Sequence, residues 1–214
     1  MNGAVAAGVP RGRLPSMAAD GARFAVRLAE TEFGGVDAGV WLFAHEPTRI
    51  PAPGPEGLEA WAADWLDEGT PTERRRGTAK DNALRRLKKE GALRDEYVVR
   101  LAPALAAVVD ASATLKGHTV CVVLLTEAPG DDAEFMATMK RAARHPVFWV
   151  FIGADSSVER VCPLGVVDTL GREPGDPDNF VVLKVGNWSS LTRWLTTRRI
   201  RRAVRRWRKV TPIG

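Results

Sequence analysis

Few residues of this 214-residue chain have the type and spacing that catalysis requires. The histidines are His45, His118 and His145, and an imidazole can act as a general acid or base near neutral pH. No serine or cysteine nucleophile motif accompanies them. The sequence also lacks a phosphate-binding loop (GxxxxGK followed by Ser or Thr) and a GxGxxG turn. A hydrolase that uses His45 with Glu127 ranks last among the functions considered. We therefore expect a protein that is not an enzyme.

The two cysteines, Cys121 and Cys162, predict neither a disulfide framework nor a metal site, because no CxxC or Cys/His ligand spacing is present. Cys121 lies in an apolar run and is expected to be a small buried side chain. No apolar stretch approaches the roughly 20 residues that a membrane helix needs. The first basic residues, Arg11 and Arg13, follow the apolar start rather than precede it, unlike a secretion signal. We expect a cytoplasmic protein.

Charge is divided unevenly along the chain. The net charge is +5, but residues 1–178 sum to −5, whereas residues 179–214 contain ten basic residues and no acidic one. There Ile200, Val204 and Trp207 have helical spacing among arginines, a pattern typical of a helix that lies on an anionic membrane. Nucleic-acid phosphates are an alternative ligand, and a third interpretation is that the apolar residues extend a packed helix whose basic residues are only solvated. The candidate residues for an anionic partner are Arg198, Arg199, Arg201, Arg202, Arg205, Arg206, Trp207, Arg208 and Lys209.

The elements that must position these residues alternate between strands and helices. Apolar runs predict strands, and helical periodicity predicts helices, the last of which starts near Trp188 and packs Trp188, Leu191 and Leu195 on the sheet. The fold class is therefore α/β: a doubly wound, mostly parallel sheet covered by helices on both faces, with a basic C-terminal helix. The predicted strands are 38–44, 119–126, 147–153 and 180–185, and the other predicted helices are 16–32, 57–66, 98–113 and 131–145.

Ligands of such folds bind at the carboxyl ends of the strands. The residues that directly follow the predicted strands should therefore matter most for function. They are His45 and Glu46, Thr126 and Glu127, and Gly153 to Asp155.

Four segments carry a family resemblance. The segments TVCVVLLTEAPGDD, HPVFWVFIGAD, DPDNFVVLKVGNWSSL and ADGARFAVRLAETEFGGVDAGVWLFAHEPTRIP resemble von Willebrand factor A (vWA) domains. They are most similar to the bacterial branch found with tellurium-resistance (Ter) stress proteins. The resemblance covers roughly residues 17–195, with a break at 73–96, which we interpret as a charged insertion or mobile loop. We expect a vWA-like domain over residues 1–197 and a basic tail over 198–214.

The resemblance implies protein partners and a metal-ion-dependent adhesion site, built from a DxSxS motif, a loop threonine and an aspartate in a TDG turn. In this chain GVPRGRLPSM stands where DxSxS is expected, which leaves only Ser16 as a hydroxyl ligand. Glu127 replaces the aspartate of the turn, and the loop threonine is either Thr70 or Thr78. Mg²⁺ demands near-ideal octahedral oxygen ligands, so this set should hold it poorly. We expect no bound metal or other cofactor, and a non-enzymatic protein-binding module of a bacterial stress or tellurium-resistance type system.

The first strand is the weakest element of this prediction. Only residues 4–9, AVAAGV, are available for it, and they contain few strong strand formers. The resemblance places this strand at the centre of the sheet. Three explanations remain: the segment pairs despite its composition, another chain fills the slot, or the true start lies upstream of Met1.

Overall fold

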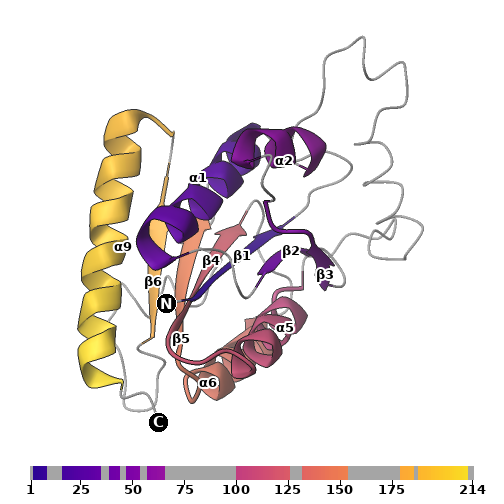
Figure 1. Cartoon of the computed structure of the whole chain (residues 1–214). Helices are drawn as coiled ribbons and strands as arrows, with labels where there is room; N and C mark the ends of the chain where they lie inside the picture. The colour runs from indigo at the N-terminus through magenta and orange to yellow at the C-terminus, as the bar shows by residue number, and fades with distance from the viewer. Residues whose placement is uncertain are drawn as a thin grey trace.

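The computed structural model describes residues 2–8, 16–34, 39–43, 47–53, 57–65, 100–125, 132–153, 179–185 and 188–211. It shows a six-stranded sheet with helices on both sides (Figure 1). The elements in chain order are β1 (Asn2–Gly8), α1 (Ser16–Phe33), β2 (Gly39–Phe43), β3 (Pro47–Ile50), α2 (Leu58–Trp65), α5 (Ala102–Ala113), β4 (Thr119–Leu125), α6 (Asp132–Ala142), β5 (Val147–Gly153), β6 (Phe180–Lys184) and α9 (Ser190–Val210).

The sheet is parallel except at one edge. Its strand order is β3-β2-β1-β4-β5-β6. The pairs β2–β1, β1–β4, β4–β5 and β5–β6 are parallel, and β3 pairs with β2 in the antiparallel sense. The predicted fold class, α/β with a mostly parallel sheet, is confirmed.

Strand β1 occupies the centre of the sheet despite its weak composition. Ala4 is in register with Gly39 of β2 on one side and with Cys121 of β4 on the other. A strand with a neighbour on each side satisfies its backbone groups along both edges, and this tertiary pairing outweighs low β-propensity. Of the three explanations for the weak first strand, the structure shows the first, in which the segment itself pairs.

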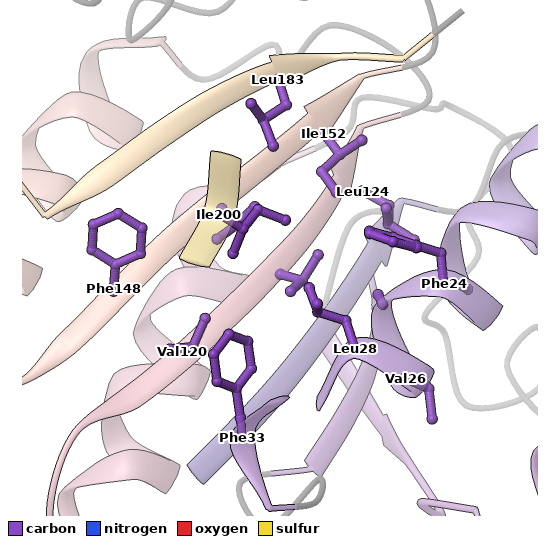
Figure 2. Close-up of a cluster of buried hydrophobic side chains, with 14 of the residues drawn as sticks. Phe24, Val26, Leu28, Phe33, Val120, Leu124, Phe148, Ile152, Leu183 and Ile200 are labelled. Carbon is purple, nitrogen blue, oxygen red and sulfur yellow. The ribbon is translucent and has the colours of Figure 1, made fainter. Parts of the chain in front are cut away.

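The two faces of the sheet bury two separate apolar cores, because successive strand residues point to opposite faces. In the first core, α1, α2 and α9 cover Val120, Val122 and Leu124 of β4 (Figure 2). In the second core, α5 and α6 cover the residues between them along the strand, such as Cys121 and Val123. Both faces of β4 and β5 are therefore buried, as their near-continuous apolar runs predicted.

Cys121 is completely buried in the second core, as expected from its apolar surroundings. Burial raises the pKa of its thiol, because the apolar interior disfavours the thiolate. The thiolate is the reactive form of cysteine, so Cys121 is a packing residue in the native protein.

Two boundary residues of helices bear on the rest of the structure. Gly34 follows α1 with a φ of 81°, a left-handed conformation that ends the helix. Ser189 precedes α9, and its hydroxyl accepts a hydrogen bond from the Thr192 amide at 3.3 Å. This cap fixes where α9 begins. Among the helices that the structure describes, none combines the length and the apolar character needed to cross a bilayer.

Candidate functional site on the outer side of helix α9

The residues predicted for metal binding are almost entirely outside the described part of the chain. Thr70, Thr78 and Glu127 lie outside the described residues, as does His45 of the hydrolase alternative. Ser16 is the first residue of α1, and the structure describes its backbone only. Within the described ranges, no group of three His, Cys, Asp or Glu residues could hold a metal ion.

His118 has a structural position at the end of α9. Its side chain is buried, and its Nε2 lies 2.9 Å from the carbonyl oxygen of Thr211. Because that oxygen can only accept, Nε2 carries the proton and donates it. The ring also meets the Trp207 ring edge to face, with 4.7 Å between centroids. Through these contacts with Thr211 and Trp207, His118 links the C-terminal end of α9 to the start of β4.

Helix α9 is one continuous helix that crosses the expected boundary between domain and tail at 197/198. Its buried side lies along the sheet, and Figure 2 shows Ile200 within the first core. The exposed fractions are 0% for Ile200, 2% for Val204 and 5% for Trp207. The prediction that this stripe faces an anionic membrane is therefore wrong for the stripe itself. These residues extend the packed helix, so Trp207 is not available for a partner.

Two of the three residues that were expected to pack on the sheet, Leu191 and Leu195, lie instead on the solvent side. Leu191 is 66% exposed and Leu195 is 51% exposed. Leu191 and Ile200 are nine residues apart, which at about 100° per residue places them on opposite sides of the helix. Of these three residues only Trp188, just before α9, packs against the first core. The centroid of its ring lies 4.8 Å from that of the Phe24 ring.

The outer side of α9 has two parts. The first, which we call the apolar patch, consists of Leu191, Trp194 and Leu195. The second, which we call the basic face, is a run of exposed cationic residues along the remaining turns. Spacings of three and four residues align the patch and the basic face along one side of the helix. The basic face comprises Arg198, Arg199, Arg202, Arg205, Arg206, Arg208 and Lys209.

Two arginines of α9 have specific partners. Arg201 donates two hydrogen bonds to the carboxylate of Glu32 on α1, and this interaction raises the pKa of Arg201. The Arg198 guanidinium lies 5.4 Å from the centroid of the Trp194 ring, within cation–π range. Among the described residues, no carboxylate forms an ion pair with any member of the basic face.

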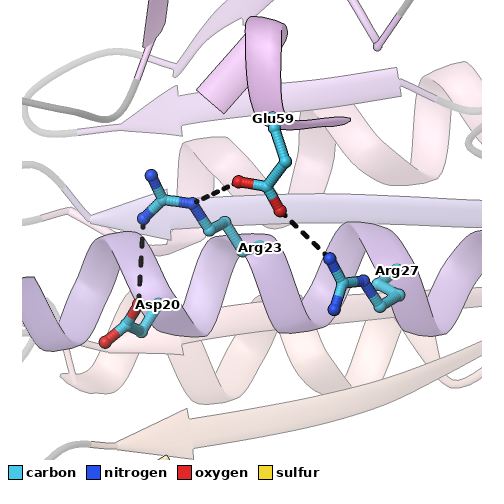
Figure 3. Close-up of polar contacts among 4 residues, drawn as sticks. All are labelled: Asp20, Arg23, Arg27 and Glu59. Carbon is cyan, nitrogen blue, oxygen red and sulfur yellow. Dashed lines mark hydrogen bonds and ion pairs between the residues drawn. The ribbon is translucent and has the colours of Figure 1, made fainter. Parts of the chain in front are cut away.

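A cavity of about 490 Å³ lies between α1, α2 and α9, and we call it the α1–α9 groove. Ion pairs lie on its α1 side (Figure 3). Arg23 Nη1 lies 3.8 Å from Asp20 Oδ1, and Arg23 Nε lies 3.5 Å from Glu59 Oε2. Arg27 Nη2 lies 3.0 Å from Glu59 Oε1. The groove is lined by Asp20, Arg23, Phe24, Arg27, Leu28, Thr31, Glu32, Glu59, Arg193, Trp194 and Thr197.

Sequence reasoning found the basic residues but missed the apolar patch and the groove. The patch was visible in principle, because a single helical projection over residues 190–210 places Leu191 and Leu195 opposite Ile200 and Val204. The groove was not, because it joins α1, Glu59 of α2 and α9, which are far apart in the sequence. Comparison with known proteins found no family model that matches the chain and no matching curated protein.

Proposed function

We propose that this chain is a non-enzymatic protein-binding module of the vWA type, with a weakened metal-ion-dependent adhesion site, that works in a bacterial stress or tellurium-resistance type system. The sequence segments quoted above support the family assignment. The parallel sheet with β1 at its centre is compatible with it. The observation that carries the binding role is the apolar patch beside the basic face on the outer side of α9.

The composition of this side resembles that of protein interfaces. Four large hydrophobic residues are exposed among the described residues, and three of them form the apolar patch. A clustered apolar surface rimmed by polar residues is a common mark of an interaction site. Tryptophan and arginine are also the residues most enriched at interface hot spots. The inner side of α9 already anchors the helix, so the outer side is free to bind.

A photo-crosslinking amino acid at position 195 tests this proposal. In bacterial cells that express the full chain, Leu195 replaced by p-benzoylphenylalanine should give a discrete protein adduct upon irradiation. The matched control is the same substitution at Ala106, an exposed residue of α5 on the opposite face of the sheet. An equal adduct pattern at both positions, or none at position 195, contradicts the proposal.

The weakened metal site leads to a separate prediction. Titration of the full chain with Mg²⁺ or Mn²⁺ in a calorimeter should give a dissociation constant no tighter than about 1 mM, because the set lacks the leading aspartate and has Glu127 in the turn. Glu127→Ala should leave the titration unchanged. Tight one-to-one binding that disappears in Glu127→Ala would show a working site.

A second candidate function is binding to an anionic surface, either a membrane or a nucleic acid, through the basic face. One observation favours it: the basic face is exposed and has no carboxylate partner among the described residues. Trp207 cannot contribute, because it is buried in the first core. Contact would therefore depend mainly on charge and would weaken with salt.

Removal of two charges tests this candidate. The double variant Arg202→Gln, Arg205→Gln should bind phosphatidylserine vesicles and duplex DNA roughly 30-fold more weakly at low salt, since each of the two basic residues contributes about 1 kcal/mol near an anionic surface. The control, Lys140→Gln with Arg144→Gln, removes the same charge from an exposed site on and just beyond α6. Equal losses in both double variants would mean that only net charge matters and would reject a role for α9.

A further inference from the structure

We propose that the α1–α9 groove seats an acidic peptide segment of a protein partner, which places one large apolar side chain against Trp194. This inference rests on the proposed function and specifies its partner. The groove has a volume of about 490 Å³, within the range of about 300–1,000 Å³ typical of ligand sites. Phe24 and Leu28 of α1 and Trp194 of α9 supply its apolar lining, so it can receive an apolar anchor.

The charges around the groove favour an acidic segment. Each carboxylate in the lining already faces a guanidinium: Glu59 faces Arg23 and Arg27, Asp20 faces Arg23, and Glu32 faces Arg201. Arg193 is the remaining cation of the lining, and it has no carboxylate partner among the described residues.

Beyond Arg193 the basic face continues along α9. The α9 side of the groove is therefore rich in cationic side chains, which favour acidic segments over basic ones.

Trp194 joins the apolar and the charged parts of this surface. It is 55% exposed and lines the groove, and the Arg198 guanidinium lies over its ring. A rigid aromatic side chain beside a stacked guanidinium offers apolar contact and carboxylate binding within one helical turn. A segment with an aromatic residue or leucine followed by acidic residues would satisfy both.

A membrane does not fit this groove as well as a peptide does. The lining is concave, and a flat bilayer cannot enter a concave site, whereas an extended peptide can. A bilayer that met the protein would lie along the basic face and leave the groove unused.

Selection from a displayed random-peptide library, with the full chain as bait, tests the inference. Enriched peptides should be acidic and should carry an aromatic residue or leucine. The tightest peptide, measured by fluorescence polarisation, should bind Trp194→Ala at least about tenfold more weakly, as expected for a hot spot, and Arg193→Gln several-fold more weakly. The controls are Val210→Ala, at the exposed far end of the same helix, and Lys140→Gln, on α6 at the opposite face of the sheet. Both should bind within about twofold of the wild type.

The outcomes separate this inference from the proposed function. If acidic peptides bind and both groove variants bind them as the wild type does, the groove is not the site, although protein binding stands. If no peptide is enriched and no adduct forms at position 195, both fall. If Trp194→Ala weakens binding to phosphatidylserine vesicles but not to the selected peptide, a membrane is the occupant and the inference is overturned.

Discussion

Trp207→Ala should lower the free energy of unfolding by about 3–5 kcal/mol, the range found when a buried aromatic side chain is truncated. Trp207 is 5% exposed, and its ring lies 5.3 Å from that of Phe148 and 4.7 Å from that of His118. Its removal would leave a cavity under the last turns of α9. Urea unfolding followed by circular dichroism measures the change.

Trp194→Ala is the matched control for this prediction, because it truncates the same side chain on the same helix. Trp194 is 55% exposed, so the loss of stability should be within about 0.5 kcal/mol, as for most surface substitutions. Similar losses for the two variants would mean that α9 does not have one packed side and one exposed side.

The second large effect is expected on the opposite face of the sheet. Phe135→Ala should destabilise the protein by about 3–5 kcal/mol, because Phe135 of α6 is fully buried and meets Phe151 of β5 edge to face at 5.8 Å. The same urea experiment measures it. Phe135→Leu keeps most of the volume and should cost roughly 1–2 kcal/mol. A loss below about 1 kcal/mol in Phe135→Ala would contradict a packed second core.

These two predictions follow from the same layered arrangement. Trp207 belongs to the core that α1, α2 and α9 form with one face of the sheet, and Phe135 belongs to the core under α5 and α6. Helix α9 is held at its C-terminal end by the hydrogen bond from His118 to Thr211 and near its middle by Arg201 with Glu32. This fixed placement presents the apolar patch and the basic face as a rigid surface, which reduces the entropy cost of binding.

Four of the six strands, β2, β4, β5 and β6, could be predicted closely from the sequence because their pattern is local, whereas β3 was not among the predicted strands. The predicted strand 147–153 matches β5, and the strand predicted at 119–126 matches β4 over its described residues, Thr119–Leu125. The first strand was harder, because its stability comes from pairing with β2 and β4 and not from its own residues. A stretch of alanine and valine does not by itself indicate which distant segments it will pair with.

The orientation of α9 could not be predicted with the same certainty, because both sides of the helix contain apolar residues. The arginines around Ile200 and Val204 suggested an exposed stripe, yet their long side chains extend into solvent from positions beside a buried one. Which stripe packs depends on the contacts with Phe148 and His118, which the local sequence does not contain. Trp194, and not Trp207, is therefore the tryptophan of α9 that a partner can reach.

The most direct measurement of whether α9 has a structural side and a binding side is a paired one on Trp194→Ala. Its urea unfolding curve and its affinity for the selected acidic peptide should be recorded on the same preparation. We predict a free energy of unfolding within about 0.5 kcal/mol of the wild type and an affinity at least about tenfold lower. A stability loss as large as that of Trp207→Ala, together with unchanged peptide affinity, would contradict the binding role of the outer side of α9.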